Sequence, residues 1–345
     1  MIRRKRFAQA NAVFSDRIRF TRVQRNHENG LMKINSRTTQ QIRAARPARN
    51  PVVPEKPYAF FVEKEHNASG AVVDVATLLL TNAECPFTCL MCDLWKNTLP
   101  RSGPEVSIAN QIRTALGELP LAREIKLYNS GNFFDPKAIP RHQYGEIAEL
   151  VRRFDTVIVE NHPKLCGDEC KRFRDLIAPA QLEIALGLET CHPEVLAALN
   201  KDMTLTDFDR ATDFLNQSQI RTRAFVLLRP PFMNEAEGIE WAERTVTFAF
   251  DRGVSLCAVI PTRAGNGIME QLELEGHFSP PEGDSMEQIL SRCLEMKRGR
   301  VTIDLWDAER FFSCENCRVK RIQRLQNMNL TQMIEPSIEC AECRS

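Results

Sequence analysis

The chain has 345 residues, 43% hydrophobic and 26% charged, which excludes wholesale disorder. Its formal charge of +1 is unevenly distributed, because residues 1–49 carry a net charge of +11 and the other 296 residues carry −10. This acidic body argues against a broad surface for binding polyanions. No apolar run approaches the roughly 18 residues of a membrane span. We therefore expect a cytoplasmic protein without membrane association.

Residues 1–60 are basic, poor in apolar periodicity and closed by a proline-rich stretch. We predict that they form a disordered arm. Such an arm is consistent with contact to RNA or with an organelle transit peptide. A third reading is a start site placed too early, because Met32 begins a plausible shorter chain and residues 1–31 would then be absent. We place a core domain at 61–299 and a C-terminal extension at 300–345.

From residue 72, apolar runs alternate regularly with amphipathic segments. Such repetition predicts parallel strands joined by crossover helices. Six strand–helix steps are fewer than the eight of a closed barrel. We therefore predict an α/β fold, a partial (βα)6 TIM-like barrel. The expected strands are 72–80, 124–128, 156–160, 182–188, 222–228 and 255–260; the expected helices are 107–119, 141–153, 168–178, 193–199, 206–217, 237–250 and 285–296, followed by a last strand at 300–306.

Seven of the twelve cysteines are clustered, which indicates metal binding. We expect no secretory signal, since Asp16 and Arg17 interrupt any apolar segment near the start, and the thiols should stay reduced. Clustered cysteines then favour metal over disulfides. The clusters are Cys85, Cys89 and Cys92; Cys314 with Cys317; and Cys340 with Cys343.

The first cluster follows the first predicted barrel strand. Cys85, Cys89 and Cys92 have the spacing Cys-x3-Cys-x2-Cys. Three thiolates ligate three irons of a cubane cluster and leave the fourth iron free for a substrate or cofactor. The carboxyl ends of barrel strands are also where active sites are built. The alternatives are a zinc site and a redox-regulated group of thiols.

This spacing and placement resemble the radical S-adenosylmethionine (SAM) superfamily, in particular its elongator-type and methylthiotransferase-type members. The residue before the third cysteine is usually aromatic in that superfamily, whereas here it is Met91, a polarizable apolar side chain. The resemblance implies a 4Fe-4S cluster that binds SAM, cleaves it reductively and so forms a 5′-deoxyadenosyl radical. It also implies an electron donor of the flavodoxin or ferredoxin type.

The resemblance further implies which strand ends contact the cofactor. Ser130, Gly131 and Asn132 correspond to the turn that faces its amino group, although only one glycine remains here. Glu160 ends the third strand, beside His162. Glu189 resembles a ribose-binding carboxylate, with a structural salt bridge as the alternative. Arg223 is expected to pair with the cofactor carboxylate or, equally, with Glu189.

The tail carries two Cys-x2-Cys pairs separated by 22 residues, a spacing close to that of zinc ribbons. Cys314, Cys317, Cys340 and Cys343 are therefore predicted to hold one metal ion, with zinc favoured over an auxiliary iron–sulfur cluster. Between the pairs lie four basic residues that either contact nucleic-acid phosphates or cover a solvated helix: Arg318, Lys320, Arg321 and Arg324.

Segments 127–136 and 304–307 and the tail cysteines resemble the group that includes the radical SAM subunit of archaeosine synthase. That resemblance implies a tRNA 7-deazaguanine substrate and a partner protein that presents the tRNA. One alternative is a radical SAM enzyme that acts on a small metabolite. The other is a non-catalytic, metal-folded adaptor that binds RNA.

Overall fold

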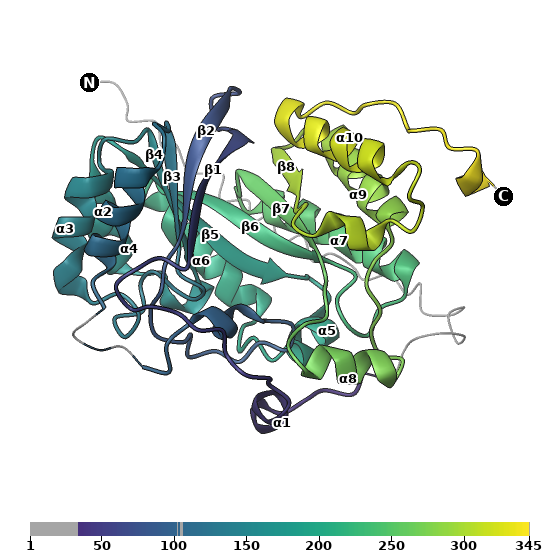
Figure 1. Cartoon of the computed structure of the whole chain (residues 1–345), viewed down its shortest axis with the longest axis horizontal. Helices are drawn as coiled ribbons and strands as arrows, with labels where there is room; N and C mark the ends of the chain where they lie inside the picture. Colours follow the sequence, from purple (N-terminus) through teal and green to yellow (C-terminus); the bar gives the residue numbers. More distant parts are fainter. Residues whose placement is uncertain (1–33, 102, 104–105, 345) are drawn as a thin grey trace, which may run out of the picture. The chain divides into compact units, whose positions relative to one another are not determined.

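A computed structural model describes residues 34–101, 103 and 106–344, and it contains one curled sheet of eight strands (Figure 1). The predictions for residues 1–31 lie outside the described residues. The strands pair in chain order, the first two antiparallel and all others parallel. They are β1 (Ala59–His66), β2 (Val72–Leu79), β3 (Glu124–Tyr128), β4 (Thr156–Asn161), β5 (Gln181–Glu189), β6 (Arg221–Leu228), β7 (Leu256–Pro261) and β8 (Arg300–Ile303).

Crossover helices connect the parallel strands, which confirms the predicted α/β half-barrel. Ser107 caps the first of them as expected, its hydroxyl accepting from the Asn110 N–H at 3.2 Å. The α-helices are α1 (Thr39–Ala44), α2 (Ile108–Glu118), α3 (Tyr144–Val151), α4 (Asp168–Ile177), α5 (Pro193–Ala198), α6 (Leu205–Gln217), α7 (Glu235–Asp251), α8 (Ile268–Leu274), α9 (Gly283–Glu295) and α10 (Arg318–Thr331). Short 3-10 turns lie at Leu94–Asn97, Arg141–Gln143, Pro163–Leu165, Ala308–Phe311 and Glu342–Arg344.

The core lies between the sheet and the helices. All six residues of β4 are buried, and so are eight of the nine residues of β5, because parallel strands are covered on both faces. Helices α2, α3 and α4 pack side by side against one part of the sheet, and α7 packs with α9 against another (Figure 1). Among the described residues, no helix is both long and apolar enough to cross a membrane.

Two elements near the start of the chain differ from the prediction. Residues 34–60 were expected to belong to a disordered arm, but helix α1 forms there and buries Ile42, and β1 begins at Ala59. Strand β1 was missed because its residues Glu63 and Glu65 point to the inside of the sheet, where they pair with Lys126. An alternation of apolar and polar residues, the usual strand signal, is therefore absent.

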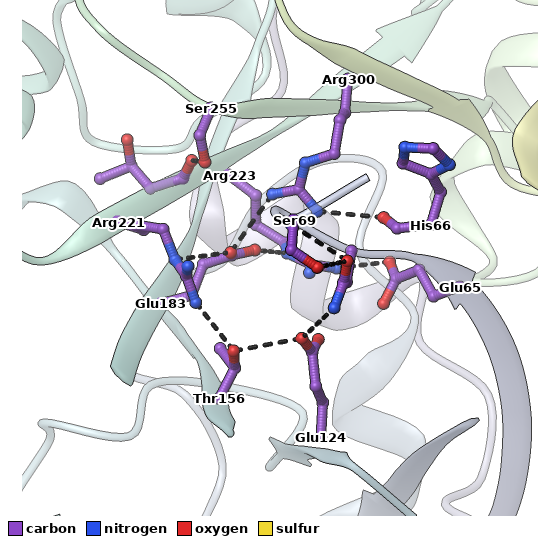
Figure 2. A network of polar contacts seen from close by, with 12 residues as sticks. Glu65, His66, Ser69, Glu124, Thr156, Glu183, Arg221, Arg223, Ser255 and Arg300 are labelled. Atoms are coloured by element: carbon purple, nitrogen blue, oxygen red, sulfur yellow. Dashed lines mark hydrogen bonds and ion pairs between the residues drawn. The ribbon is translucent and has the colours of Figure 1, made fainter. Parts of the chain in front are cut away.

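A network of buried charges fills the inside of the curl near the amino ends of the parallel strands (Figure 2). Arg223 Nε donates to Glu183 Oε1 at 2.5 Å, and its Nη1 lies 2.9 Å from Glu65 Oε1. Lys126 Nζ lies 3.1 Å from Glu65 Oε2. Burial alone would raise the pKa of Glu65, but the charges of Arg223 and Lys126 outweigh burial and lower it to about 2.

These contacts join strands that are not neighbours in the sheet. Arg223 lies on β6 and Glu65 on β1, so four strands separate them in the order of pairing. Arg300 of β8 donates to the carbonyl of His66 on β1 at 3.1 Å, and His66 Nδ1 lies 2.8 Å from the carbonyl oxygen of Leu330 on α10. Helix α10 packs against both β1 and β8. The two edges of the sheet are thus held together by side chains and one helix.

We expect Arg223→Met to lower the free energy of unfolding by about 3–5 kcal/mol, because the buried carboxylates of Glu65 and Glu183 each lose one cationic partner. Urea unfolding monitored by circular dichroism measures the change. Lys64→Met is the matched control, since Lys64 pairs with Asp74 at 3.0 Å but is 61% exposed, and it should cost less than about 1 kcal/mol. Equal effects of the two substitutions would contradict a central role for Arg223.

Candidate functional site

The three-cysteine loop lies directly after β2, at the carboxyl edge of the parallel strands, and loops from other strands hold it there. The Leu90 N–H donates to the Leu199 carbonyl at 2.8 Å, and Asn200 Nδ2 donates to the Thr88 carbonyl at 2.7 Å. Asn266 Nδ2, from the loop after β7, donates to the carbonyls of Leu90 and Cys92 at 2.8 and 3.1 Å. The backbone between the cysteines is therefore fixed from two sides.

Phe87, between the first and second cysteines, fixes the loop from a third side. Its ring stacks on His162 at 3.7 Å between centroids, with 14° between the planes. His162 Nε2 in turn lies 3.0 Å from the Lys201 carbonyl oxygen. Burial and the nearby Lys201 ammonium lower the pKa of His162 to about 3, so its imidazole is neutral at physiological pH. His162 is a support for the loop rather than a charged group.

The three cysteines are half-buried, and the Lys201 ammonium group lies near two of them. Burial raises the pKa of Cys85, of Cys89 to about 11, and of Cys92, while the positive charge of Lys201 opposes the rise at Cys85 and Cys89. Asn132 Nδ2 also donates to Cys85 Sγ at 3.1 Å. Buried thiols favour the thiolate only when positive charge compensates it. A cationic iron–sulfur core together with Lys201 fits this donor set.

The spacing of the thiols separates this loop from the tail cysteines. Within the described part of the chain, Cys314, Cys317, Cys340 and Cys343 are the only set of three or more potential metal ligands whose ligand atoms lie within 4.8 Å of one another. The loop cysteines are not such a set. This is the expected difference, because the ligands of a cubane bind different iron atoms whereas four ligands of one ion converge on one point.

The predicted cofactor turn after β3 lies beside this loop and is held by Glu160. Glu160 Oε1 accepts the N–H groups of Asn129 at 2.6 Å and of Gly131 at 3.2 Å. Burial raises the pKa of Glu160 to about 7, although these backbone donors oppose the rise. Ser130 has a left-handed backbone with φ 53°, and its Oγ lies 2.8 Å from the Tyr58 hydroxyl oxygen. Glu160 therefore fixes the backbone of this turn through two hydrogen bonds.

Glu189 ends β5 and pairs with a residue that the sequence did not single out. Its Oε1 lies 2.9 Å from Lys201 Nζ, and both residues are buried. A Cβ on Gly187 would lie 2.3 Å from that oxygen and 2.5 Å from that nitrogen, so a larger residue there would displace the ends of both side chains. The structural salt bridge, the alternative raised for Glu189, is thus present. Lys201 carries no sequence signal, because it follows α5 in an ordinary loop.

Arg223 lies at the other end of the barrel. It points into the curl and pairs with Glu183 and Glu65 (Figure 2), and not with Glu189 as one prediction had it. Glu183 occupies its Nε and Glu65 its Nη1. The physical reason is the position of each residue along its strand. Arg223 is the third residue of β6 and pairs with Ala185 in the middle of β5, whereas Glu189 is the last residue of β5.

Residues 34–58, which we call the strap, lie over the entry and exit of the cysteine loop. Arg46 pairs with Glu84, just before the first cysteine, at 2.6 Å, and Arg49 pairs with the same carboxylate. Arg49 also donates to the Trp95 carbonyl at 2.6 Å, and both guanidinium groups face the Trp95 ring. Two of the arginines that suggested a disordered basic arm, Arg46 and Arg49, are therefore partners of the site.

The four tail cysteines come together as predicted. Cys314 Sγ lies 3.8 Å from Cys340 Sγ, and Cys317 Sγ lies 3.6 Å from Cys343 Sγ. Cys317 is also the N-cap residue of α10, so metal binding would fix the start of that helix. Four convergent thiols match a structural metal site.

The predicted basic patch on α10 is only partly available for phosphates. Arg321 pairs with Glu287 at 2.5 Å and also with Asp284, both on α9. Arg324 is buried, lies 3.2 Å from Glu287 and donates to the Glu335 carbonyl. These two arginines attach α10 to α9, so the patch reduces to Arg318 and Lys320.

The chain is similar in sequence to several known proteins. No protein-family model matches the chain. The chain is 23% identical over 316 residues to an uncharacterized protein of Methanocaldococcus jannaschii, covering 84% of this chain and 85% of that protein. It is 26% identical to archaeosine synthase subunit beta of Thermococcus kodakarensis, covering 56% of this chain and 62% of the relative. It is 25% identical to the protein of the same name from Methanosarcina acetivorans, covering 49% of this chain and 50% of that relative.

The chain thus spans less than two thirds of the two named relatives. Among solved structures, Elp3 of Methanocaldococcus infernus has a TM-score of 0.49 at 15% identity, covering 65% of this chain and 60% of that one. Queuine lyase of Clostridium spiroforme has a TM-score of 0.43 at 16% identity, covering 64% and 87%. The similarity to the two archaeosine synthase subunits supports the relationship to the radical SAM superfamily that the cysteine loop predicts.

The ion pairs of the strap with Glu84 can be tested by substitution. The double substitution Arg46→Met, Arg49→Met removes both partners of Glu84, and each lost hydrogen bond to a charged group costs about 1.5–3 kcal/mol. We expect a reconstituted iron–sulfur cluster to be lost at least about tenfold faster, as measured by the decay of its visible absorbance. Arg43→Met, an exposed position in the same segment, is the matched control. Equal decay in the double variant and the wild type would show that the strap does not support the loop.

The four-cysteine site of the tail can be tested in the same way. Cys340→Ser should reduce the metal content of the tail from one ion per chain to almost none, because a four-thiolate site loses a ligand. Elemental analysis measures the metal, and limited proteolysis between Ser337 and Cys343 should become faster. Cys191→Ser, outside both cysteine groups, should change neither value. Retention of the ion by the variant would exclude four-thiolate coordination.

Proposed function

We propose that this chain is a radical SAM enzyme that holds a 4Fe-4S cluster on Cys85, Cys89 and Cys92. The observation that supports this most strongly is the three-cysteine loop, held by neighbouring loops at the carboxyl edge of a half-barrel. Three thiolates leave one iron of the cluster open. When bound and reduced, such a cluster supplies the electron that cleaves SAM to methionine and a 5′-deoxyadenosyl radical.

The residues around the loop have distinct tasks in this proposal. The turn at Ser130, Gly131 and Asn132 presents backbone and side-chain polar groups to the cofactor, and Glu160 holds the turn in place. Lys201 neutralises charge beside the thiolates and positions Glu189. Glu189 Oε2 remains as an acceptor for ribose hydroxyls. A reaction through a radical also needs water to be excluded, and the strap covers one side of the loop.

For the substrate we propose a 7-deazaguanine nucleoside of tRNA. The support comes from the two relatives named archaeosine synthase subunit beta. The body of the chain is acidic, with a net charge of −10 over residues 50–345, so its own attraction for RNA phosphates is weak. We therefore propose a partner protein that presents the tRNA and a flavodoxin- or ferredoxin-like electron donor. The tail site is proposed to hold zinc, because four thiolates around one ion suit zinc.

The decisive experiment is anaerobic reconstitution with iron and sulfide, followed by dithionite, SAM and chromatography of 5′-deoxyadenosine. The wild-type chain should form 5′-deoxyadenosine, and Cys92→Ala should form none, because one iron loses its ligand. Cys293→Ala is the matched control, since that cysteine is buried on α9 and belongs to neither cysteine group. It should behave as the wild type.

The two possible outcomes distinguish an enzyme from a metal-folded adaptor. Cleavage that requires Cys92 supports the enzyme, and unmodified tRNA is then the first substrate to add. An assembled cluster that neither binds nor cleaves SAM would contradict the proposal and favour a metal-folded adaptor.

A further inference from the structure

Trp306 stands exposed at the same edge of the sheet as the cysteine loop. It follows β8 by three residues, and 64% of its surface is accessible. Trp95, in the cysteine loop region, is only 4% accessible. Tryptophan is a large, flat aromatic residue that is enriched at binding surfaces. The exposure of Trp306 therefore calls for an explanation.

The backbone of Trp306 is held firmly although its ring is exposed. Its carbonyl accepts from Arg263 Nη1 at 2.7 Å, and its N–H donates to Asp304 Oδ1 at 3.1 Å. Arg263 and Asp304 form an ion pair with each other, and the Asp304 N–H donates to the Val259 carbonyl at 2.8 Å. The ring is thus presented from a fixed position, which lowers the entropic cost of binding a flat ligand.

The loop that holds Trp306 also holds the cysteine loop. Asn266 in that loop donates to the carbonyls of Leu90 and Cys92, and Arg263 contacts Trp306. Asn266 lies three positions after Arg263, which is at most about 10 Å of chain. Trp306 is therefore on the rim of the candidate site rather than on a remote surface.

The surroundings of Trp306 favour a nucleobase over a protein partner. The next exposed residues along the chain, Asp307, Glu309 and Arg310, are charged. A protein interface needs a continuous, well-packed area with a desolvated centre, which a single aromatic ring among charges does not provide. A base needs only one flat face, and stacking on tryptophan tolerates any base.

We propose that Trp306 is a stacking platform for an unpaired base of the RNA substrate, next to the nucleotide that enters the site. This inference rests on the proposed function, because it requires an RNA substrate. Recognition of unpaired bases by aromatic side chains is the usual mode for single-stranded RNA. In an acidic body, stacking would supply affinity that phosphate contacts do not.

The test uses the full reconstituted chain and an unmodified tRNA transcript with a fluorescent label, at one salt concentration. Trp306→Ala should weaken binding roughly 5- to 150-fold, the range that the loss of one base–aromatic stack produces. Trp306→Phe keeps an aromatic face and should bind within a few-fold of the wild type. In the Trp306→Phe variant, tRNA should no longer quench the tryptophan fluorescence of the protein. Leu274→Ala, at an 89% exposed apolar position on α8, is the matched control and should bind as the wild type.

Unchanged tRNA affinity in Trp306→Ala would overturn the inference. Equal weakening in the alanine and phenylalanine variants would also overturn it, because stacking would then not be the cause. If the wild-type chain binds no tRNA but still cleaves SAM, the stacking platform fails while the radical SAM proposal stands. If the wild type binds tRNA through Trp306 without cleaving SAM, the platform stands and the enzyme proposal fails.

Discussion

The curl of the sheet depends on one buried guanidinium group. Arg223 on β6 pairs with Glu183 on the neighbouring strand and with Glu65 on β1, across the inside of the curl. Four strands separate β1 from β6 in the sheet, so this pair exists only if the sheet bends. The buried charges of this network are stable because positive and negative groups are paired, whereas an unpaired buried ion would strongly raise the free energy of the folded state. The same bend brings the loops at the opposite end of the strands toward one another.

At that carboxyl edge, the candidate site is built by loops that fix one another. The cysteine loop receives hydrogen bonds from the segments after α5 and β7, a stacked ring from the segment after β4 and ion pairs from the strap. Each anchor is a modest interaction, but together they hold the backbone of the three cysteines, two of which lie near the buried Lys201 ammonium. A site for a reactive intermediate requires such preorganisation, since groups held in place need not rearrange during the reaction.

The C-terminal extension closes the open side of the half-barrel. Helix α10 packs on both β1 and β8, and its arginines attach it to α9. Because the helix begins at Cys317, a metal ion on the four tail cysteines would anchor its first turn. The metal site and the closure of the sheet are thus two parts of one structural unit. A tail too small to bury a core of its own is stabilised in this way.

The sequence by itself determined the alternation of strands and helices, the placement of Cys85, Cys89 and Cys92 after the first barrel strand, and the pairing of the two tail knuckles. These features are local, since periodicity, capping and cysteine spacing are written in consecutive residues. Only the tertiary structure decided that β1 adds an antiparallel edge strand to the half-barrel, that Arg223 belongs to the interior network and that Lys201 accompanies Glu189. It likewise made Arg46 and Arg49 of the strap partners of Glu84 and Trp95. Such charged residues find their partners across long separations in the chain, and no local pattern specifies which opposite charge the fold will bring within reach.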